Sequence, residues 1–394
     1  MKTKNILSIG VAWLVALSLV PLDGVAAPTC DEETADDSVL SGDSGGSGAV
    51  YLMTNQVPNA ITVFDRGHDG TLTMVGTFPT GGDGNPVPQP GDPPTDPLGS
   101  QGSLILSPHF HFLFAVNAGS NEISVMRVMP HGLTLVEKVP SGGTRPISVT
   151  ANSNFLYVLN EGGTPNITGF RFDNQGHLTP LAGSTRPLSG GADVDPAEVG
   201  FSARGDVLAV TEKHSNIIDT YTVGHDGIPT GPVTTASHGM TPFGFAFDNC
   251  ANLIVSEAFG GAPNQSAVSS YHLKADGTLD VTSGSIPDTQ TAACWIVIAN
   301  RGRTVFTTNT GSGTVSSYEV HSGGVLSLAN AVAADLGTGS SPIDMALEKN
   351  GRFLYVHAAG AQAIKLLRVG SDGGLTLLSS TGGLPLGAQG IAAR

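Results

Sequence analysis

A four-strand pattern recurs seven times along this chain and constrains its fold more than any other feature. Each copy has an apolar inner strand, a tight turn, a second strand such as Phe-Leu-Tyr-Val that ends in a polar residue, a third strand such as Ile-Ser-Val, and a Gly turn. The second strands are residues 50–55, 112–117, 155–160, 207–212, 252–257, 304–309 and 353–358. Repeats of this length and strand content are typical of β-propellers. We therefore predict an all-β fold, a seven-bladed β-propeller with four-stranded blades.

Other architectures fit the pattern poorly. The periodic segments are short and rich in Val, Ile, Thr and aromatic residues, and Gly or Pro interrupts the windows in which a helix could form. Turns such as Asp226-Gly227 and Asp276-Gly277 are hairpin signals, because these residues tolerate positive φ. A β-sandwich gives no reason for one four-strand pattern to recur seven times.

The first copy lacks an inner strand. Only a Gly-, Ser- and Asp-rich stretch precedes Val50, whereas residues 389–394 at the other end of the sequence form an extra apolar strand. We predict that this strand completes the first blade and covers two sheet edges that would otherwise be exposed. The predicted propeller then spans residues 49–394.

The N-terminal residues resemble a targeting segment. Lys2 and Lys4 precede an apolar stretch over 6–20, and small residues follow near Ala27, which predicts a cleaved signal peptide over residues 1–27. The alternative is a membrane anchor, but the stretch is shorter than the ~20 residues that a spanning helix needs. We predict a secreted or periplasmic protein without stable membrane insertion, with a flexible acidic Gly/Ser-rich tail over 28–48.

An insertion rich in Pro, Gly and Asp separates the first two blades, over residues 80–101. It emerges on the face where each fourth strand leads to the next blade, so it forms either a flap over that face or a loop that covers a sheet edge. Whether it binds calcium through its aspartates stays open; these are Asp83, Asp92 and Asp96.

Three cysteines are present: Cys30, Cys250 and Cys294. An odd number leaves at least one thiol unpaired in an oxidising compartment. Cys250 and Cys294 fall at opposite ends of the predicted blades, so their pairing is geometrically poor, whereas Cys30 lies in the tail and could reach Cys250. The sequence does not decide between these possibilities.

The formal net charge is −15. A chain this acidic lacks the basic surface that nucleic acids require. We expect a monomer that binds a small-molecule ligand or substrate and no nucleic acid.

Seven residues share one structural level, the end of each second strand, and should surround the mouth of the central channel. Six of them are polar: Asn55, Asn117, Asn160, Glu212, Glu257 and Asn309; the seventh is Ala358. The asparagines either cap turns or bind a substrate. Two carboxylates near one channel could supply a general base and a charge partner.

Further polar residues open onto the same face, at or near the starts of inner strands: Gln101, Arg145, Glu198, His238 and Asp344. Our candidate catalytic residues are Glu257, Glu212 and His214. The candidate substrate-binding residues are Asn55, Asn117, Asn160, Asn309, Arg145, Glu198 and Asp344. Because most histidines fall in hairpins on the opposite face, and no HExxH or CxxC spacing occurs, we expect no metal and no cofactor.

The repeated Phe-Leu-Tyr-Val-x-Asn strands, with turns such as 202–206 and 348–352, resemble those of the lactonase-type seven-bladed propellers, which include 6-phosphogluconolactonases and carboxymuconate cyclases. The resemblance covers residues 49–394. It implies hydrolysis of a lactone or related ester at the channel mouth. Tyr51-Leu-Met-Thr-Asn55 also resembles the YVTN surface-layer-type propellers, which implies the alternative, a non-enzymatic secreted binding module.

The chain departs from the family's catalytic pattern. Where the family has Pro-His, this sequence has Pro196-Ala197, and where it has Pro-Arg-His, this sequence has Pro242-Phe243-Gly244. The family's Asn-Arg is Asn309-Thr310 here. Glu257 matches the family's glutamate to within one residue. The lost cations would otherwise hold an anionic substrate and stabilise an oxyanion.

Overall fold

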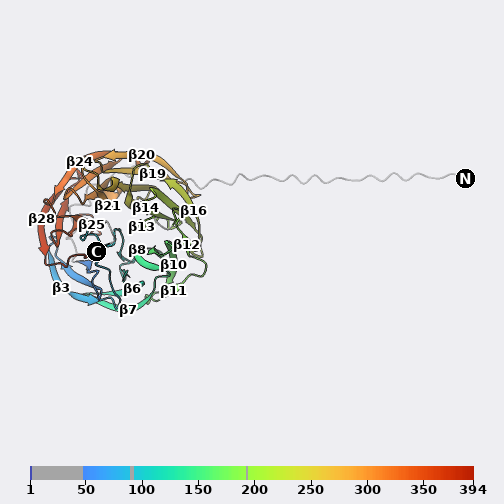
Figure 1. Cartoon of the computed structure of the whole chain (residues 1–394), viewed down its shortest axis with the longest axis horizontal. Coiled ribbons are helices and arrows are strands. Elements are labelled where there is room, and N and C mark those ends of the chain that lie inside the picture. The colour runs from blue at the N-terminus through green and yellow to red at the C-terminus, as the bar shows by residue number, and fades with distance from the viewer. Residues whose placement is uncertain (2–47, 89–92, 192–193) are drawn as a thin grey trace.

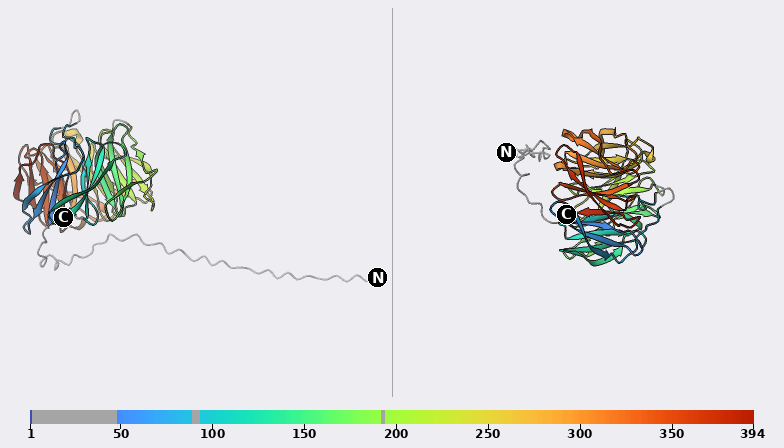
Figure 2. Two further views of the ribbon diagram at one scale, coloured as in Figure 1. Left: turned by 90° about the horizontal axis from the view of Figure 1, so that it is seen from below. Right: turned by 90° about the vertical axis from the view of Figure 1, so that its left-hand side faces the viewer.

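Seven antiparallel sheets stand around a central axis in the computed structural model of the chain, as the view down the shortest axis shows (Figure 1). The structure describes Met1 and residues 48–88, 93–191 and 194–394. Figure 2 shows the sheets from the side, as a ring about one strand length thick. The fold predicted from the repeat, a seven-bladed β-propeller with four-stranded blades, is confirmed.

Each blade runs from an inner to an outer strand. Blade 1 contains β29 (Ile391–Ala393), β1 (Gly48–Met53), β2 (Ala60–Arg66) and β3 (Leu72–Pro79). Blade 2 contains β4 (Leu104–Leu106), β5 (Phe112–Asn117), β6 (Glu122–Met129) and β7 (Gly132–Pro140). Blade 3 contains β8 (Thr144–Asn152), β9 (Phe155–Gly162) and β10 (Asn166–Phe172), with β11 (Leu178–Pro180) and β12 (Arg186–Pro187) both paired to β10.

Blades 4 to 7 follow the same plan. They contain β13 (Pro196–Phe201), β14 (Val207–Glu212), β15 (Ile217–Val223) and β16 (Pro229–Ala236); β17 (Pro242–Phe247), β18 (Asn252–Glu257), β19 (Ala267–Leu273) and β20 (Leu279–Pro287); β21 (Ala293–Ala299), β22 (Thr304–Asn309), β23 (Thr314–Val320) and β24 (Leu326–Asp335); and β25 (Pro342–Leu347), β26 (Phe353–Ala358), β27 (Ala363–Val369) and β28 (Leu375–Gly382). Within the described residues, three short 3₁₀ turns lie in the connections: η2 (Phe259–Gly261), η3 (Asn300–Gly302) and η4 (Ser322–Gly324).

The core lies between neighbouring blades. Second strands such as β14 and β22 are buried along their whole length, whereas outer strands such as β28 are largely exposed. Three third strands place a fully buried tyrosine at their fifth position, and its hydroxyl bonds the chain leading out of the preceding blade. Tyr221 donates to the carbonyl of Pro187, Tyr318 donates to that of Ile286, and Tyr271 accepts from the N–H of His238. These bonds join blades 4, 5 and 6 each to the blade before it.

The ring closes through strands from the two ends of the propeller. β29 pairs antiparallel with β1, with Leu52 opposite Ile391 and Val50 opposite Ala393. The backbone of Arg394 donates to Ala49 at 2.9 Å and accepts from it at 3.3 Å. A buried ion pair of 3.1 Å between Arg66 and Glu348 joins blade 1 to blade 7. The predicted closure of the first blade by the C-terminal strand is confirmed.

Cysteine chemistry differs between the two ends of the blades. Cys250, in the turn between β17 and β18, is disulfide-bonded, whereas Cys294 on β21 is a buried free thiol.

The predicted signal peptide, nearly all of the predicted tail and Cys30 lie outside the described residues. Among the residues that the structure describes, no helix is both long and apolar enough to span a bilayer.

Candidate site in the central channel

The four asparagines predicted to surround the channel mouth are completely buried. The side-chain N–H groups of Asn117 and Asn309 donate to Ser124 and Ser316, both at 2.7 Å, which is one contact repeated in two blades. Asn55 donates to the carbonyls of Asn85 and Gly387. Asn160 donates to Asn166 at 3.2 Å. Asn117, Asn160 and Asn309 thus bond within their own hairpins, whereas Asn55 bonds segments distant in sequence, and none of the four lines the channel cavity described below.

The two predicted glutamates at this level are also completely buried. Glu257 accepts hydrogen bonds from the backbone of Gly239 and from the hydroxyls of Ser269 and Ser285. Glu212 accepts from Ser215 at 2.5 Å, and burial together with the neighbouring Asp219 raises the pKa of Glu212 to about 7. Both carboxyl groups hold loops between blades and lie outside the channel cavity.

The second half of the insertion closes the mouth above these residues. We call residues 96–101 the plug. Arg145 donates to the carbonyl of Pro97 at 2.8 Å, and Lys213 donates to that of Gly99 at 2.7 Å. The predicted substrate-binding Arg145 also pairs with Glu161 at 2.5 Å, and Lys213 pairs with Asp195 at 3.1 Å. The two cations are therefore engaged in holding the plug.

The plug is also fixed by blades that lie far from it in sequence. Trp295 donates its indole N–H to the carbonyl of Ser100 at 3.1 Å. The amide of Gln389 donates to Asp96 and Ser100 and accepts from the N–H of Leu98. His214, the third predicted catalytic residue, lies 3.4 Å from Asp195, the partner of Lys213, and its side chain is 59% exposed. It does not line the channel cavity.

Gln101, the last residue of the plug, extends into the channel. Its amide oxygen accepts from the N–H of Ile296 at 2.9 Å, and its amide nitrogen donates to the carbonyl of the same residue at 3.0 Å. It also donates to Phe245 at 3.4 Å. Gly244 leaves room for this side chain, since a Cβ atom there would clash with it.

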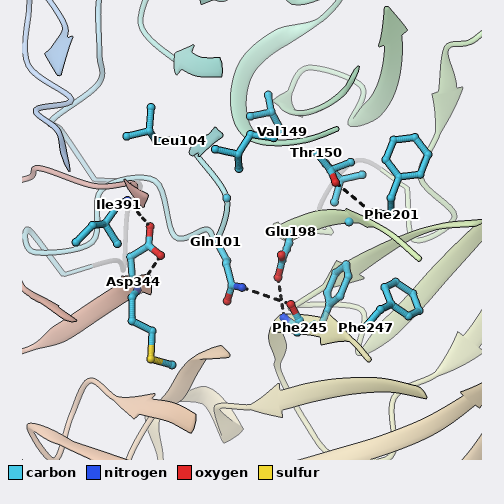
Figure 3. A pocket seen from close by; sticks show the side chains of 16 residues that line it. Gln101, Leu104, Val149, Thr150, Glu198, Phe201, Phe245, Phe247, Asp344 and Ile391 are labelled. Atoms are coloured by element: carbon cyan, nitrogen blue, oxygen red, sulfur yellow. Dashed lines mark hydrogen bonds between the residues drawn. The ribbon is translucent and has the colours of Figure 1, made fainter. Parts of the chain in front are cut away.

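A cavity of about 280 Å³ lies inside the channel, beyond Gln101 (Figure 3). Glu198 and Asp344, near the plug, are 8% and 4% exposed. Thr150, Phe201 and Phe247, toward the other ends of their inner strands, are only partly buried. The cavity is therefore shielded at the predicted mouth and is more accessible toward the opposite face, where the first and second strands of each blade are joined.

Glu198 and Asp344, both predicted as substrate-binding, are the acidic residues that line this cavity. Glu198 follows an irregularity in the pairing of β13 with β14 and accepts from the N–H of Phe245 at 2.6 Å. Its other carboxyl oxygen has no hydrogen-bond partner within the described part of the chain. Burial raises the pKa of Glu198 well above its ordinary value, and the charge of Asp344 adds to this.

Asp344 has a positive φ of 55° at an irregularity in β25, a conformation that aspartate tolerates better than most residues. Its two oxygens accept from the backbone of Met345 at 2.9 Å and of Ile391 at 3.1 Å. Burial raises the pKa of Asp344 to about 7 despite these hydrogen bonds, and the nearby Asp96 contributes to the rise. A carboxyl group with such a pKa can exchange protons near neutrality.

The rest of the lining is apolar or uncharged. Leu104, Val149, Met345, Ile391 and three phenylalanines are among the lining residues, and no lysine, arginine or histidine contributes to the lining. Sequence reasoning missed Thr150, Phe201, Phe245 and Phe247 as lining residues. The alternating Phe243-Gly-Phe-Ala-Phe247 of one inner strand was the available signal, since its aromatic side chains had to pack beside the channel.

Comparison with solved structures finds similar folds over almost the whole chain. A protein from Lactobacillus plantarum has a TM-score of 0.68 and 19% identity, with 89% of this chain and 99% of that chain covered. A putative 6-phosphogluconolactonase from Bacteroides fragilis has a TM-score of 0.66 and 16% identity, with 90% of this chain and 99% of that chain covered. The periplasmic gluconolactonase of Pseudomonas aeruginosa has a TM-score of 0.66 and 14% identity, with 88% of this chain and 99% of that chain covered. At these identities the similarity concerns the fold.

No curated protein sequence matches the chain significantly. The family model described as "Lactonase, 7-bladed beta-propeller" matches residues 101–258 and 263–385, which is well over half of the sequence. The chain therefore belongs to the lactonase family of seven-bladed β-propellers.

Proposed function

We propose that this protein binds a lactone or related ester in the channel cavity and hydrolyses it. The observation that carries the proposal is Asp344, a buried carboxyl group with a pKa of about 7 in the wall of a cavity that fits a small molecule. A general base is most effective when its pKa lies near the working pH. Membership of the lactonase family supports the choice of reaction.

In the proposed reaction, ionised Asp344 takes a proton from a water molecule as the water oxygen attacks the ester carbonyl. The backbone N–H groups of Met345 and Ile391 hold the carboxylate in place. The bond between the carbonyl carbon and the ring oxygen then breaks, and the ring oxygen takes up the proton from Asp344. One water and one lactone give one hydroxy acid, and Glu198 contacts the substrate from the same cavity.

The proposal moves the general base from Glu257 and Glu212 to Asp344. Glu257 is saturated by three hydrogen bonds, and neither glutamate lines the cavity. It also disfavours a phosphorylated substrate, because the lining offers no cationic side chain to balance a phosphate. An ester ring without negative charge fits this wall best.

A panel of lactones without anionic groups tests the proposal. We expect ester hydrolysis by the wild-type protein and at least a 100-fold lower kcat for Asp344→Asn. Glu257→Gln, if it folds, should retain the kcat of the wild type. Absence of turnover across the panel, or an Asp344→Asn variant as active as the wild type, would contradict the proposal.

A second candidate is a non-enzymatic binding module, as the sealed mouth and the missing cations of the family pattern favour. Such a protein would be stabilised by a ligand without converting it, since a ligand that binds only the folded state raises the melting temperature. Thermal shift and product analysis on the same lactones separate the two functions.

We also propose export from the cytoplasm. The pattern of residues 1–27 and the disulfide at Cys250 support it, because disulfides persist in oxidising compartments. Cell fractionation with N-terminal sequencing of the mature protein tests this. We expect cleavage near Ala27, and an uncleaved chain in the cytosolic fraction would contradict it.

A further inference from the structure

We propose that the ligand of the channel cavity carries a positive charge, as an ammonium group, and that Glu198 is the residue that binds this group. This deepens the proposed function, on which it rests for the ester part of the ligand. The preference for a cation follows from the cavity alone.

Glu198 presents a carboxyl oxygen to the cavity that accepts no hydrogen bond from the described residues. The residue is 8% exposed and one of its oxygens is fixed by Phe245 at 2.6 Å. The other oxygen has no partner among the described residues, and the side chain lines the cavity (Figure 3). The N–H of Phe245 is the one hydrogen-bond donor to Glu198 among the described residues, so a ligand in the cavity that brings a charge-assisted hydrogen bond or a positive charge stabilises the ionised form of this group.

The charged residues that line the cavity are both acidic. Asp344 lies close enough to Glu198 for its charge to raise the pKa of Glu198, and Asp96 acts on Asp344 in the same way. The cations of the mouth, Arg145 and Lys213, bond to the plug and are absent from the lining. The two carboxyl groups therefore retain protons when the cavity is empty, and a bound cation can replace these protons, whereas an anion would meet no compensating charge.

Three phenylalanines contribute to the lining of the cavity. Phe201, Phe245 and Phe247 line the cavity, and the last two rings lie 5.9 Å apart at 84°. Aromatic faces attract ammonium groups, and the attraction is strongest where water is excluded. At about 280 Å³ the cavity lies near the lower end of ligand pockets, so it fits a small ring with one ammonium substituent.

A pair of isosteric probes isolates the charge. One is γ-butyrolactone with a trimethylammonium substituent, which is cationic at every pH, and the other carries a tert-butyl group of the same shape. Binding is measured by calorimetry at pH 8, with tetramethylammonium as a smaller probe. We expect the cationic lactone to bind the wild type at least tenfold more tightly than the neutral one.

Glu198→Gln tests the assignment, because glutamine keeps an oxygen for the N–H of Phe245 but loses the charge. In this variant the preference for the cationic probe should fall below threefold, while the neutral probe binds as before. Glu319→Gln makes the same chemical change at a side chain 58% exposed on β23 and should retain the preference.

The outcomes separate this inference from the proposed function. Equal affinity for the two lactones, a preference unchanged in Glu198→Gln, or binding of none of the three probes overturns the inference. Hydrolysis of both lactones together with equal affinity for them would overturn it while leaving the esterase function intact. Charge-selective binding that depends on Glu198 without hydrolysis would support it and contradict the esterase function.

Discussion

The side chain of Gln101 pairs with the backbone of Ile296 as a neighbouring β-strand would. Oxygen and nitrogen of one amide meet the N–H and the carbonyl of one residue, at 2.9 and 3.0 Å, across 195 positions of sequence. This pairing ties the connection between blades 1 and 2 to the inner strand of blade 6. It also satisfies backbone groups of an inner strand that has no neighbour on its channel side.

Gln101→Ala should destabilise the protein by about 2 to 4 kcal/mol, since it leaves Ile296 with two partly buried backbone groups unpaired. Urea denaturation measures the change. Gln175→Ala, at an exposed turn, provides the control and should cost less than about 0.5 kcal/mol. Similar losses in the two variants would show that the pairing contributes nothing.

Lys213→Met should loosen the plug, because it removes the bond to the carbonyl of Gly99 and the pair with Asp195. We expect faster hydrogen exchange at the amides of Leu98 and Gln101, which donate to Gln389 and to the carbonyl of Ala197. Lys274→Met removes an exposed ion pair on the outside of blade 5 and should leave these two amides unchanged. Exchange mass spectrometry decides between the outcomes.

Deletion of residues 386–394 should cost several kcal/mol, roughly 3 or more, and promote aggregation, because it removes β29 and exposes the edge of β1. Thermal unfolding with light scattering measures both effects. A truncated protein with an unchanged melting temperature would refute the role of this strand in closing the ring.

Asp344 should make stability fall as the pH rises through about 7. The folded chain keeps the carboxyl proton up to about pH 7, whereas the unfolded chain loses it near 3.8. The contribution is complete below pH 3.8 and is lost as the pH passes 7, and the difference between these pKa values corresponds to roughly 4 kcal/mol. Urea denaturation of Asp344→Asn at pH 4 and pH 8 should therefore show a smaller pH dependence than the wild type.

His357 should act in the opposite direction. It is fully buried on β26, neither ring nitrogen has a hydrogen-bond partner in the described structure, and burial lowers its pKa to about 3. The unfolded chain takes up this proton near pH 6.5, so stability is present above pH 6.5 and falls as the pH decreases toward 3. Between pH 7 and pH 4, His357→Leu should lose less stability than the wild type, by up to roughly 3 kcal/mol. Equal acid sensitivity would show that His357 does not titrate in this way.

Local alternation was sufficient to predict the blades. Segments such as 207–212 and 304–309 have the bounds of β14 and β22, because their side chains pack in a repeated environment. The first blade differs slightly: β1 ends at Met53, so Asn55 lies in the turn that follows. Glu198 and Asp344 were recognised as polar residues at inner strands that face one end of the channel.

What the sequence could not provide is the relation between distant segments. Nothing near Gln101 indicates that its partner is Ile296, and nothing near Arg145 or Lys213 indicates that carbonyl groups of an insertion will occupy them. The sequence is compatible with either a flap or an edge cover for the insertion, because the contacts of this segment depend on the final ring geometry. The cavity therefore lies below the level at which the candidate glutamates Glu212 and Glu257 were expected to act.

Because β29 pairs with β1, blade 1 has the same arrangement of strands as the other blades, although its strands come from distant parts of the sequence. Arg394 lies beside Ala49 in the same way that two residues flank the turn between the inner and second strands of any other blade. A short turn joining residue 394 to residue 48, with new termini opened at the equivalent turn of another blade, would give a circularly permuted chain with the same set of strand pairs. The fold thus depends on the cyclic order of the blades and not on which blade comes first along the chain.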